Sequence, residues 1–152
     1  MEIEYCVAAY FDWRRCVIVP NVSWGMLDYE ADLLVMTGAG CLYEVEIKCN
    51  RADIKRDLKK RHGHRNNLTR GLYFAIPEKL ENCITLIPDH AGVLLVRKTG
   101  LVEESRKPLI KKHVPKLKER DRYTLVRLAS MRIWTLTKTI IYYNNDSGRV
   151  AR

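Results

Sequence analysis

The sequence has no apolar run long enough to cross a bilayer and no secretory leader pattern. Apolar stretches such as CVIVP at 16–20 and VLLV at 93–96 have the length of strands, whereas a membrane-spanning helix needs about 20 residues. No basic segment followed by an apolar one stands at the start. We therefore expect an intracellular, cytoplasmic protein with no membrane partner.

Cysteine pairs in the spacing Cys-x-x-Cys are also absent. The five cysteines are an odd number at scattered positions, which argues against a disulfide framework and against a structural zinc site. We expect them to be reduced. His62 and His64 can in principle bind a metal ion, but their place in a basic loop favours polar surface positions.

Neither a linker nor an internal repeat divides the 152 residues. With 47% hydrophobic and 30% charged residues, the composition is that of a soluble globular protein. We expect a single domain over 1–143, followed by a flexible tail at 144–152.

Charge is distributed unevenly along this basic chain, whose formal net charge is +9. Residues 1–47 hold eight acids against two arginines, a balance of −6, and 48–70 hold nine basic residues against two acids, a balance of +7. A third segment, 97–122, has ten basic residues against four acids, or +6. An acidic cluster inside a basic protein suits a polyanionic partner, most commonly nucleic acid.

Periodicity and turn residues predict an α/β sandwich around a mixed sheet. Asn50 and Asp53 have the spacing of a capping box at the start of the second helix. The expected elements are a helix at 2–12, strands at 15–20, 30–37 and 41–50, a helix at 51–62, a strand at 72–77, a short helix at 78–83, an extended piece at 84–88, a strand at 91–98, and a closing helix at 123–143.

Charged side chains fall on one face of the strand at 41–50. Side chains along a strand alternate faces, so Glu44, Glu46 and Lys48 share one side. If the preceding strand pairs with this one, Asp32 lies beside Glu46 or Lys48. Two more acid-x-lysine triplets begin at Asp53 and Asp57, but in a helix residues two apart point in different directions.

Two readings of this charged face stay open from the residues alone. Carboxylates from adjacent strands, with a backbone carbonyl between them, form a hard-oxygen site suited to Mg²⁺. A nearby lysine can orient or deprotonate a metal-bound water and offset charge on a phosphate. Alternatively, the same side chains form cross-strand ion pairs on a solvated sheet face.

The pattern around Asp32 resembles a known family. Asp32, thirteen intervening residues, then Glu46-Ile47-Lys48 and a helix resemble the core motif of the PD-(D/E)XK nuclease superfamily, which has a restriction-endonuclease-like fold. The segments YEADLLV, EVEIKCNRADIKRDLKK, LYFAIPEKL and LIPDHAGVLLV resemble, more narrowly, the MmcB-like DNA-repair nucleases. The resemblance covers residues 28–98, with Ala31 in place of the usual proline.

The resemblance implies roles for individual residues. Asp32 and Glu46 would bind Mg²⁺, with Mn²⁺ as a substitute and the Ile47 backbone carbonyl as a third ligand, and Lys48 would serve the attacking water. Glu30 would hold a second metal or lie outside the ligands, and Glu44 is expected at the surface or outside the metal ligands. The expected activity is a magnesium-dependent endonuclease acting on DNA, in repair or processing.

Six basic residues beside this face are candidate phosphate contacts: Lys55, Arg56, Lys59, Lys60, Arg61 and Arg65. Two other classes of function remain, a DNA-binding module without catalysis and a scaffold whose charged face binds no nucleic acid. The complete set of Asp32, Glu46 and Lys48 favours the enzyme. A homo-oligomer is also compatible with the sequence.

Overall fold

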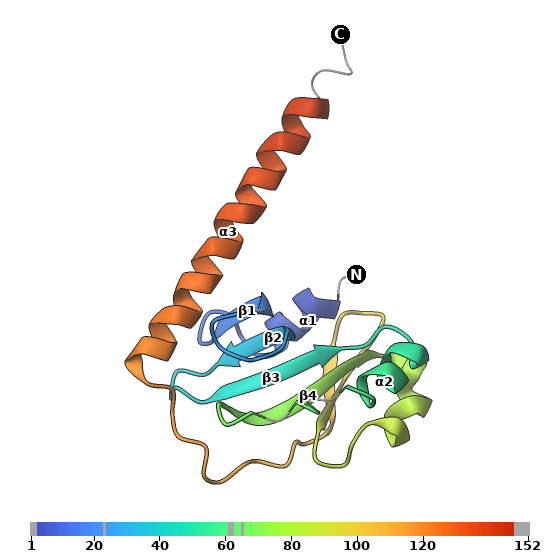
Figure 1. Ribbon diagram of the computed structural model, residues 1–152. Helices are drawn as coiled ribbons and strands as arrows, with labels where there is room; N and C mark the ends of the chain where they lie inside the picture. Colours follow the sequence, from blue (N-terminus) through green and yellow to red (C-terminus); the bar gives the residue numbers. More distant parts are fainter. Residues whose placement is uncertain (1–2, 23, 61–62, 65, 148–152) are drawn as a thin grey trace.

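The computed structural model describes residues 3–22, 24–60, 63–64 and 66–147, and it holds one six-stranded sheet with helices on both faces (Figure 1). The predicted α/β class is therefore confirmed. In chain order the elements are α1 (Ile3–Tyr10), β1 (Val17–Val22), β2 (Ala31–Met36), β3 (Leu42–Ile47), α2 (Arg51–Asp57), β4 (Thr69–Pro77), the 3₁₀ helix η1 (Glu78–Leu86), β5 (Gly92–Val96), β6 (Val102–Arg106) and α3 (Glu119–Ser147).

The strands lie side by side in chain order from β1 to β6. Strands β1, β2 and β3 are antiparallel neighbours, β3, β4 and β5 run parallel, and β6 returns antiparallel to β5. Parallel neighbours require a crossover connection. The segment with α2 makes the first crossover and the segment with η1 the second, so both begin at the edge where β3, β4 and β5 end.

Helix α2 begins as the sequence predicts and ends earlier. The side chain of Asn50, in an extended backbone conformation, accepts the backbone N–H of Asp53 at 2.9 Å and donates its amide to the Asp53 carboxylate at 2.6 Å. The helix then ends at Asp57 rather than near residue 62. Leu58, four residues after the buried Ile54, is 46% exposed, and Asp57 takes the buried position three residues after Ile54.

The two faces of the sheet carry different interiors. On one face, α1 buries Cys6 and Val7 in an apolar cluster with side chains of β2 to β5. The opposite face carries two separate apolar clusters, one beneath the start of α3 and one beneath α2 and η1. Because Glu44 pairs with Leu34 on β2 and with Leu72 on β4, charged positions of β3 lie between these two clusters.

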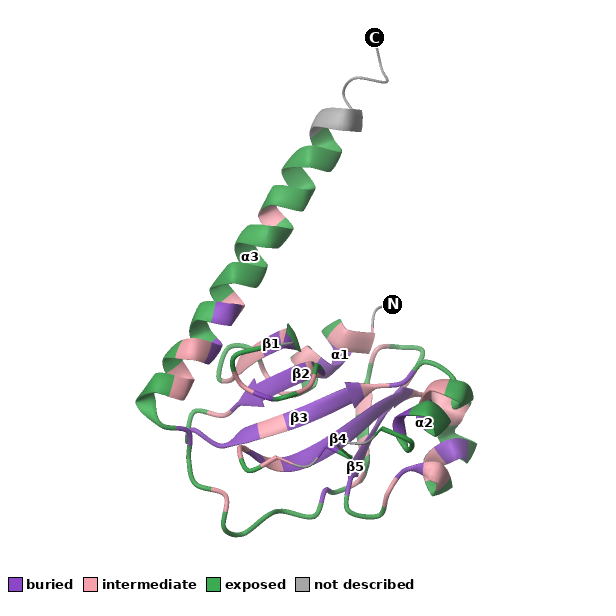
Figure 2. Cartoon of the chain, viewed as in Figure 1, coloured by how far each residue is buried: buried purple, intermediate pink, exposed green. Residues whose placement is uncertain are grey.

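The C-terminal half departs from the expected layout in three places. Residues 84–86, expected to be extended, belong to η1, and 102–106 form an additional strand. Helix α3 continues to Ser147, so 144–147 are helical, whereas 148–152 lie outside the described residues. Figure 2 shows α3 exposed over most of its length. Leu125 and Leu128 are buried, but Leu136 and Ile140, which share the same spacing, are not.

No helix among the described residues combines the length and apolarity that crossing a membrane requires.

The cap on α2 gives a first test of how this helix is held. We expect Asn50→Ala to lower the free energy of unfolding by about 1 kcal/mol, because the Asp53 N–H loses its acceptor. Urea denaturation followed by circular dichroism measures the change. Asn50→Ser is the matched control, since a serine hydroxyl can accept the same N–H and should recover most of the loss. Equal losses in both variants would contradict the capping role.

Candidate active site

Asp32 and Glu46 lie at adjacent positions on neighbouring strands. The pairing of Leu33 with Val45 and of Leu34 with Glu44, continued by one residue, places Asp32 opposite Glu46. One carboxylate oxygen of Asp32 accepts the backbone N–H of Ile47 at 2.7 Å. This bond holds the Asp32 carboxylate at the end of β3.

Lys48 brings the predicted residues together. Its Nζ lies 2.5 Å from Glu46 Oε2 and 3.6 Å from Asp32 Oδ2, so one ammonium group stands within reach of both carboxylates. The third carboxylate around it belongs to Asp57, whose Oδ1 is 3.0 Å from Nζ. Asp32, Glu46 and Lys48 thus converge.

Asp57 extends the cluster to Lys60. Lys60 Nζ lies 2.7 Å from Asp57 Oδ1 and 3.4 Å from Glu46 Oε2. Asp57 is only 3% exposed, although no sequence pattern places it with the strand residues. Because α2 ends at Asp57 and faces the sheet there, this carboxylate points toward the end of β3 and not toward solvent.

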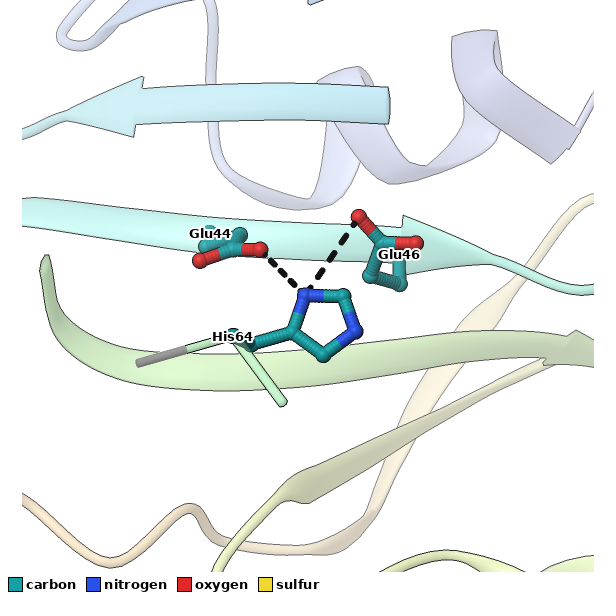
Figure 3. Close-up of side chains that lie close together, drawn as sticks. All are labelled: Glu44, Glu46 and His64. Atoms are coloured by element: carbon teal, nitrogen blue, oxygen red, sulfur yellow. Dashed lines mark hydrogen bonds and ion pairs between the residues drawn. The ribbon is translucent and has the colours of Figure 1, made fainter. Parts of the chain in front are cut away.

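His64 lies among three of the carboxylates. Its Nδ1 is 2.6 Å from Glu44 Oε1 and 3.8 Å from Glu46 Oε1 (Figure 3). Its Nε2 is 2.7 Å from Asp57 Oδ2. Gly63 and His64 both have left-handed backbone angles, with φ of 51° and 55°. Glycine adopts this conformation without strain, whereas histidine adopts it only occasionally. The turn that directs the imidazole inward therefore has an uncommon backbone conformation at His64.

We call the five buried residues Glu44, Glu46, Lys48, Asp57 and His64 the ionic layer. None is more than 7% exposed, and Glu44 and Glu46 are 0% and 1% exposed. Burying a charge is costly unless it is paired and hydrogen-bonded. Glu44 meets this requirement through His64 and also accepts the Tyr29 hydroxyl at 2.8 Å and the Asn66 amide at 3.2 Å.

The layer sets the protonation of its cations. Burial alone would lower the pKa of His64, but Asp57 and Glu44 outweigh it and raise this pKa from 6.5 to about 9. Burial likewise works against the Lys48 ammonium, and Glu46, Asp32 and Asp57 nevertheless raise the pKa of Lys48 above its ordinary value. Both side chains are therefore cations at neutral pH.

Burial by itself would raise the pKa of the Asp57 carboxyl, yet the net effect of its surroundings is to lower this pKa. Hydrogen bonds from His64 and Lys60, together with the charge of Lys48, hold the pKa of Asp57 below its usual range. Asp57 is thus a permanent anion that contacts all three cations of the cluster.

Glu46 is the carboxylate whose charge is least well compensated. Its Oε1 is buried and has no hydrogen-bond partner among the described residues. Burial, with a further contribution from Asp32, raises the pKa of Glu46 even though Lys48 opposes the shift. A divalent cation would lower the cost of keeping this carboxylate ionised.

The residues present therefore fit a hard cation such as Mg²⁺. The Lys48 ammonium already lies between Asp32 and Glu46, so this position attracts positive charge. A cavity of about 180 Å³ opens beside it, lined by Asp32, Ile47, Lys48, Asp53, Arg56, Asp57 and Lys60. Two of the three predicted residues, Asp32 and Lys48, therefore line this cavity.

A second grouping, Glu44, Glu46 and His64, also has the spacing of a metal site, with one ligand atom from each residue within 4.8 Å of the others. Its histidine, however, engages a carboxylate through each ring nitrogen, at 2.6 and 2.7 Å. With the pKa of His64 raised to about 9, a proton fills the role that a metal ion would have there. We assign these residues to the ionic layer.

Three expectations are corrected here. His64, expected on the polar surface, is 7% exposed because its turn directs it into the layer. Glu44 is fully buried because Tyr29, His64 and Asn66 cover it, so it is not a surface residue. Asp57, set aside as a helical coincidence, contacts Lys48 directly.

The remaining predicted residues lie around the cavity or outside it. Glu30 precedes β2 and is exposed. Lys55 and Arg56 are exposed on α2, and Lys59 is exposed in the turn that follows it. Lys60 is exposed as well, although its ammonium contacts Asp57 and Glu46. Arg61 and Arg65 lie outside the described residues, as does His62.

Comparisons with known proteins identify a shared fold and no family. No family model matches the chain, and no curated protein is significantly similar to it. Among solved structures, the "SPO1766 protein of unknown function" from Silicibacter pomeroyi is similar, with a TM-score of 0.65 and 19% identity. The match covers 91% of this chain and 88% of that one, so the two share an overall architecture.

The raised pKa of His64 predicts a pH-dependent stability. The pKa of His64 is about 9 in the folded protein and 6.5 in an unperturbed imidazole, so its charge stabilises the folded state fully below pH 6.5. This contribution is lost as the pH rises through 9. In metal-free buffer, we expect the free energy of unfolding to fall across this interval by on the order of 3 kcal/mol more than in His64→Gln. Urea denaturation at a series of pH values measures both proteins.

The charge of His64 also lowers the pKa of Glu46, so the difference between the two curves reports the imidazole together with its effect on that carboxylate. Parallel curves from pH 6 to 9.5 would show that the imidazole is neutral in the folded protein.

Proposed function

We propose that this protein is a magnesium-dependent nuclease, an endonuclease that hydrolyses phosphodiester bonds of DNA in repair or processing. One observation carries the proposal: the Lys48 ammonium lies between the carboxylates of Asp32 and Glu46, beside a cavity open to solvent. A solvated strand face would not need Glu46 and Lys48 to be buried at 1% and 6% exposure. The resemblance of these positions to the PD-(D/E)XK motif points to the same chemistry.

Asp32 and Glu46 are the residues that would hold Mg²⁺ or Mn²⁺, and Ile47, whose backbone carbonyl is the third candidate ligand, lines the same cavity. When bound, such an ion polarises a phosphate oxygen and lowers the pKa of a coordinated water. Asp32 is prepared for this role by the Ile47 N–H, which fixes one carboxylate oxygen at 2.7 Å. The 36% exposure of its side chain leaves it accessible from the cavity.

Lys48 acts through its charge. Because its pKa is raised, the side chain is an ammonium ion at neutral pH and is a poor general base. It can orient the attacking water and offset the negative charge that develops on the phosphate. Asp57, at 3.0 Å, holds the ammonium toward the cavity side of the cluster.

The surroundings of the cavity suit a polyanion. Arg56 lines the opening, Lys55 is exposed on the same short helix, and Lys59 is exposed in the turn just after it. The net charge of +9 favours association with nucleic acid in general. Lys60 is better assigned to the active site than to DNA, because Asp57 and Glu46 already engage it.

The first test measures metal binding and cleavage together. We expect the Asp32→Asn/Glu46→Gln variant to lose binding of Mg²⁺ and Mn²⁺. Titration calorimetry with and without a DNA duplex measures this binding. Cleavage of DNA substrates of several structures should fall by about 100-fold or more in Lys48→Met, since a charge-stabilising group is removed. Asp89→Asn is the control for loss of a carboxylate, because its side chain is fully exposed.

The outcomes separate the possible functions. Salt-sensitive DNA binding without metal binding or cleavage would identify a DNA-binding module that lacks catalysis. If wild type and Asp32→Asn/Glu46→Gln bind metal alike, or neither binds any, the nuclease proposal is wrong.

The exposed lysines on α2 and in the turn after it give an independent prediction. We expect Lys55→Gln/Lys59→Gln to weaken binding to DNA duplexes of unrelated sequence to the same extent. The dependence of log K on log salt should become shallower by about 2, because two phosphate contacts and their released counterions are lost. Fluorescence anisotropy over a salt series measures the slope. Lys138→Gln, on the projecting part of α3, should leave it unchanged.

A further inference from the structure

Helix α3 extends well beyond the part of the protein on which it packs. Figure 1 shows it leaving the sheet layer beside β1 and projecting away from it. Leu125 and Leu128 are buried against the sheet, and the Arg132 guanidinium donates to the backbone carbonyl of Asn21. Past Arg132, no described side chain of α3 is buried.

The projecting part is apolar on more than one side. Nine large apolar side chains of α3 from residue 126 onward are exposed: Val126, Met131, Ile133, Trp134, Leu136, Ile140, Ile141, Tyr142 and Tyr143. At roughly 100 Å² for each half-exposed side chain, they present on the order of 900 Å² of apolar surface, more than monomeric proteins usually expose. Arg132 and Lys138 are the only charged residues from 129 to 143.

One stripe of this surface has the spacing of a coiled-coil seam. Val126, Ala129, Ile133, Leu136, Ile140 and Tyr143 follow one another at alternating intervals of three and four residues. Such a heptad pattern places all six on one side of a helix, where they insert between side chains of a facing helix. Isoleucine at the first position of the heptad, with leucine at the fourth, favours two parallel strands.

We propose that this seam pairs with the same seam of a second copy of the chain, so that the protein is a homodimer joined by a parallel two-stranded coiled coil of α3. This proposal does not depend on the proposed nuclease function.

Charge and area both favour a second copy. In a parallel pair, a side chain at heptad position g, just before the first apolar position, faces position e of the partner helix, five residues further along. Arg132 would therefore face a threonine, residue 137 of the other copy, and meet no like charge. The five exposed seam side chains present roughly 500 Å² per helix, and the flanking side chains bring this close to the ~800 Å² per partner of a specific interface.

A second apolar stripe, with Trp134 and Ile141, lies about 100° around the helix from Ile133 and Ile140 and takes no part in this seam. Its members are 70% and 55% exposed, comparable with Ile133 at 63% and Ile140 at 50%. The two pairs are therefore comparable in exposure, and variants in one pair serve as controls for the other.

Sedimentation equilibrium over a wide concentration range tests the proposal. We expect wild type to have twice the chain mass of 17.8 kDa and Ile133→Glu/Ile140→Glu to have half the wild-type value. The four residues involved are exposed in the single chain, so these changes should leave the domain folded, which circular dichroism checks. Trp134→Glu/Ile141→Glu should remain a dimer.

A monomeric wild type overturns the proposal, and so does a dimer that only the Trp134→Glu/Ile141→Glu variant dissociates. The orientation is tested with Leu136→Cys. In a parallel pair this position meets its own counterpart, so an intermolecular disulfide should form that the wild-type cysteines do not produce under the same conditions. A dimer in which Leu136→Cys fails to cross-link would exclude the parallel arrangement.

Discussion

The buried ionic layer is the constraint on which the rest of this structure depends. Glu44 and Glu46 lie between two apolar clusters on one face of the sheet, where an uncompensated charge would cost several kcal/mol. Helix α2 and the turn at His64 supply the compensating groups. The crossover from β3 to β4 therefore has two roles. It makes the parallel pairing of these strands possible, and it supplies side chains that pair with the buried charges of β3.

The sequence reveals those parts of this arrangement that depend on local periodicity. Alternation along two strands is enough to place Asp32, Glu46 and Lys48 on one face, and the hairpin register brings them together. Asn50 and Asp53 mark the start of α2 for a similar reason, because a helix cap is read within four residues. Both features are short in range, so the sequence is sufficient for them.

Asp57 and His64 could not be found in the same way. Asp57 is buried at the end of α2. The sequence predicts a helix that continues to residue 62, so it does not single out Asp57 as a terminal residue. The position of His64 depends on two consecutive left-handed residues in a loop, of which only Gly63 is a recognisable signal. Likewise, the periodicity of α3 predicts a helix with one apolar stripe, but whether Leu136 packs on the sheet depends on how far the sheet extends.

The charges of the cluster explain how binding of the proposed metal ion would be linked to the stability of the fold. Asp32, Glu44, Glu46 and Asp57 give four negative charges against three positive ones from Lys48, Lys60 and protonated His64, a balance of −1. If His64 were neutral, the balance would be −2 and Asp57 would lose one of its partners. The proton on His64 thus permits so many carboxylates to be buried, and the remaining negative charge lies where Glu46 Oε1 has no hydrogen-bond partner among the described residues. The part of the layer with the weakest compensation is thus the part closest to the predicted metal ligands.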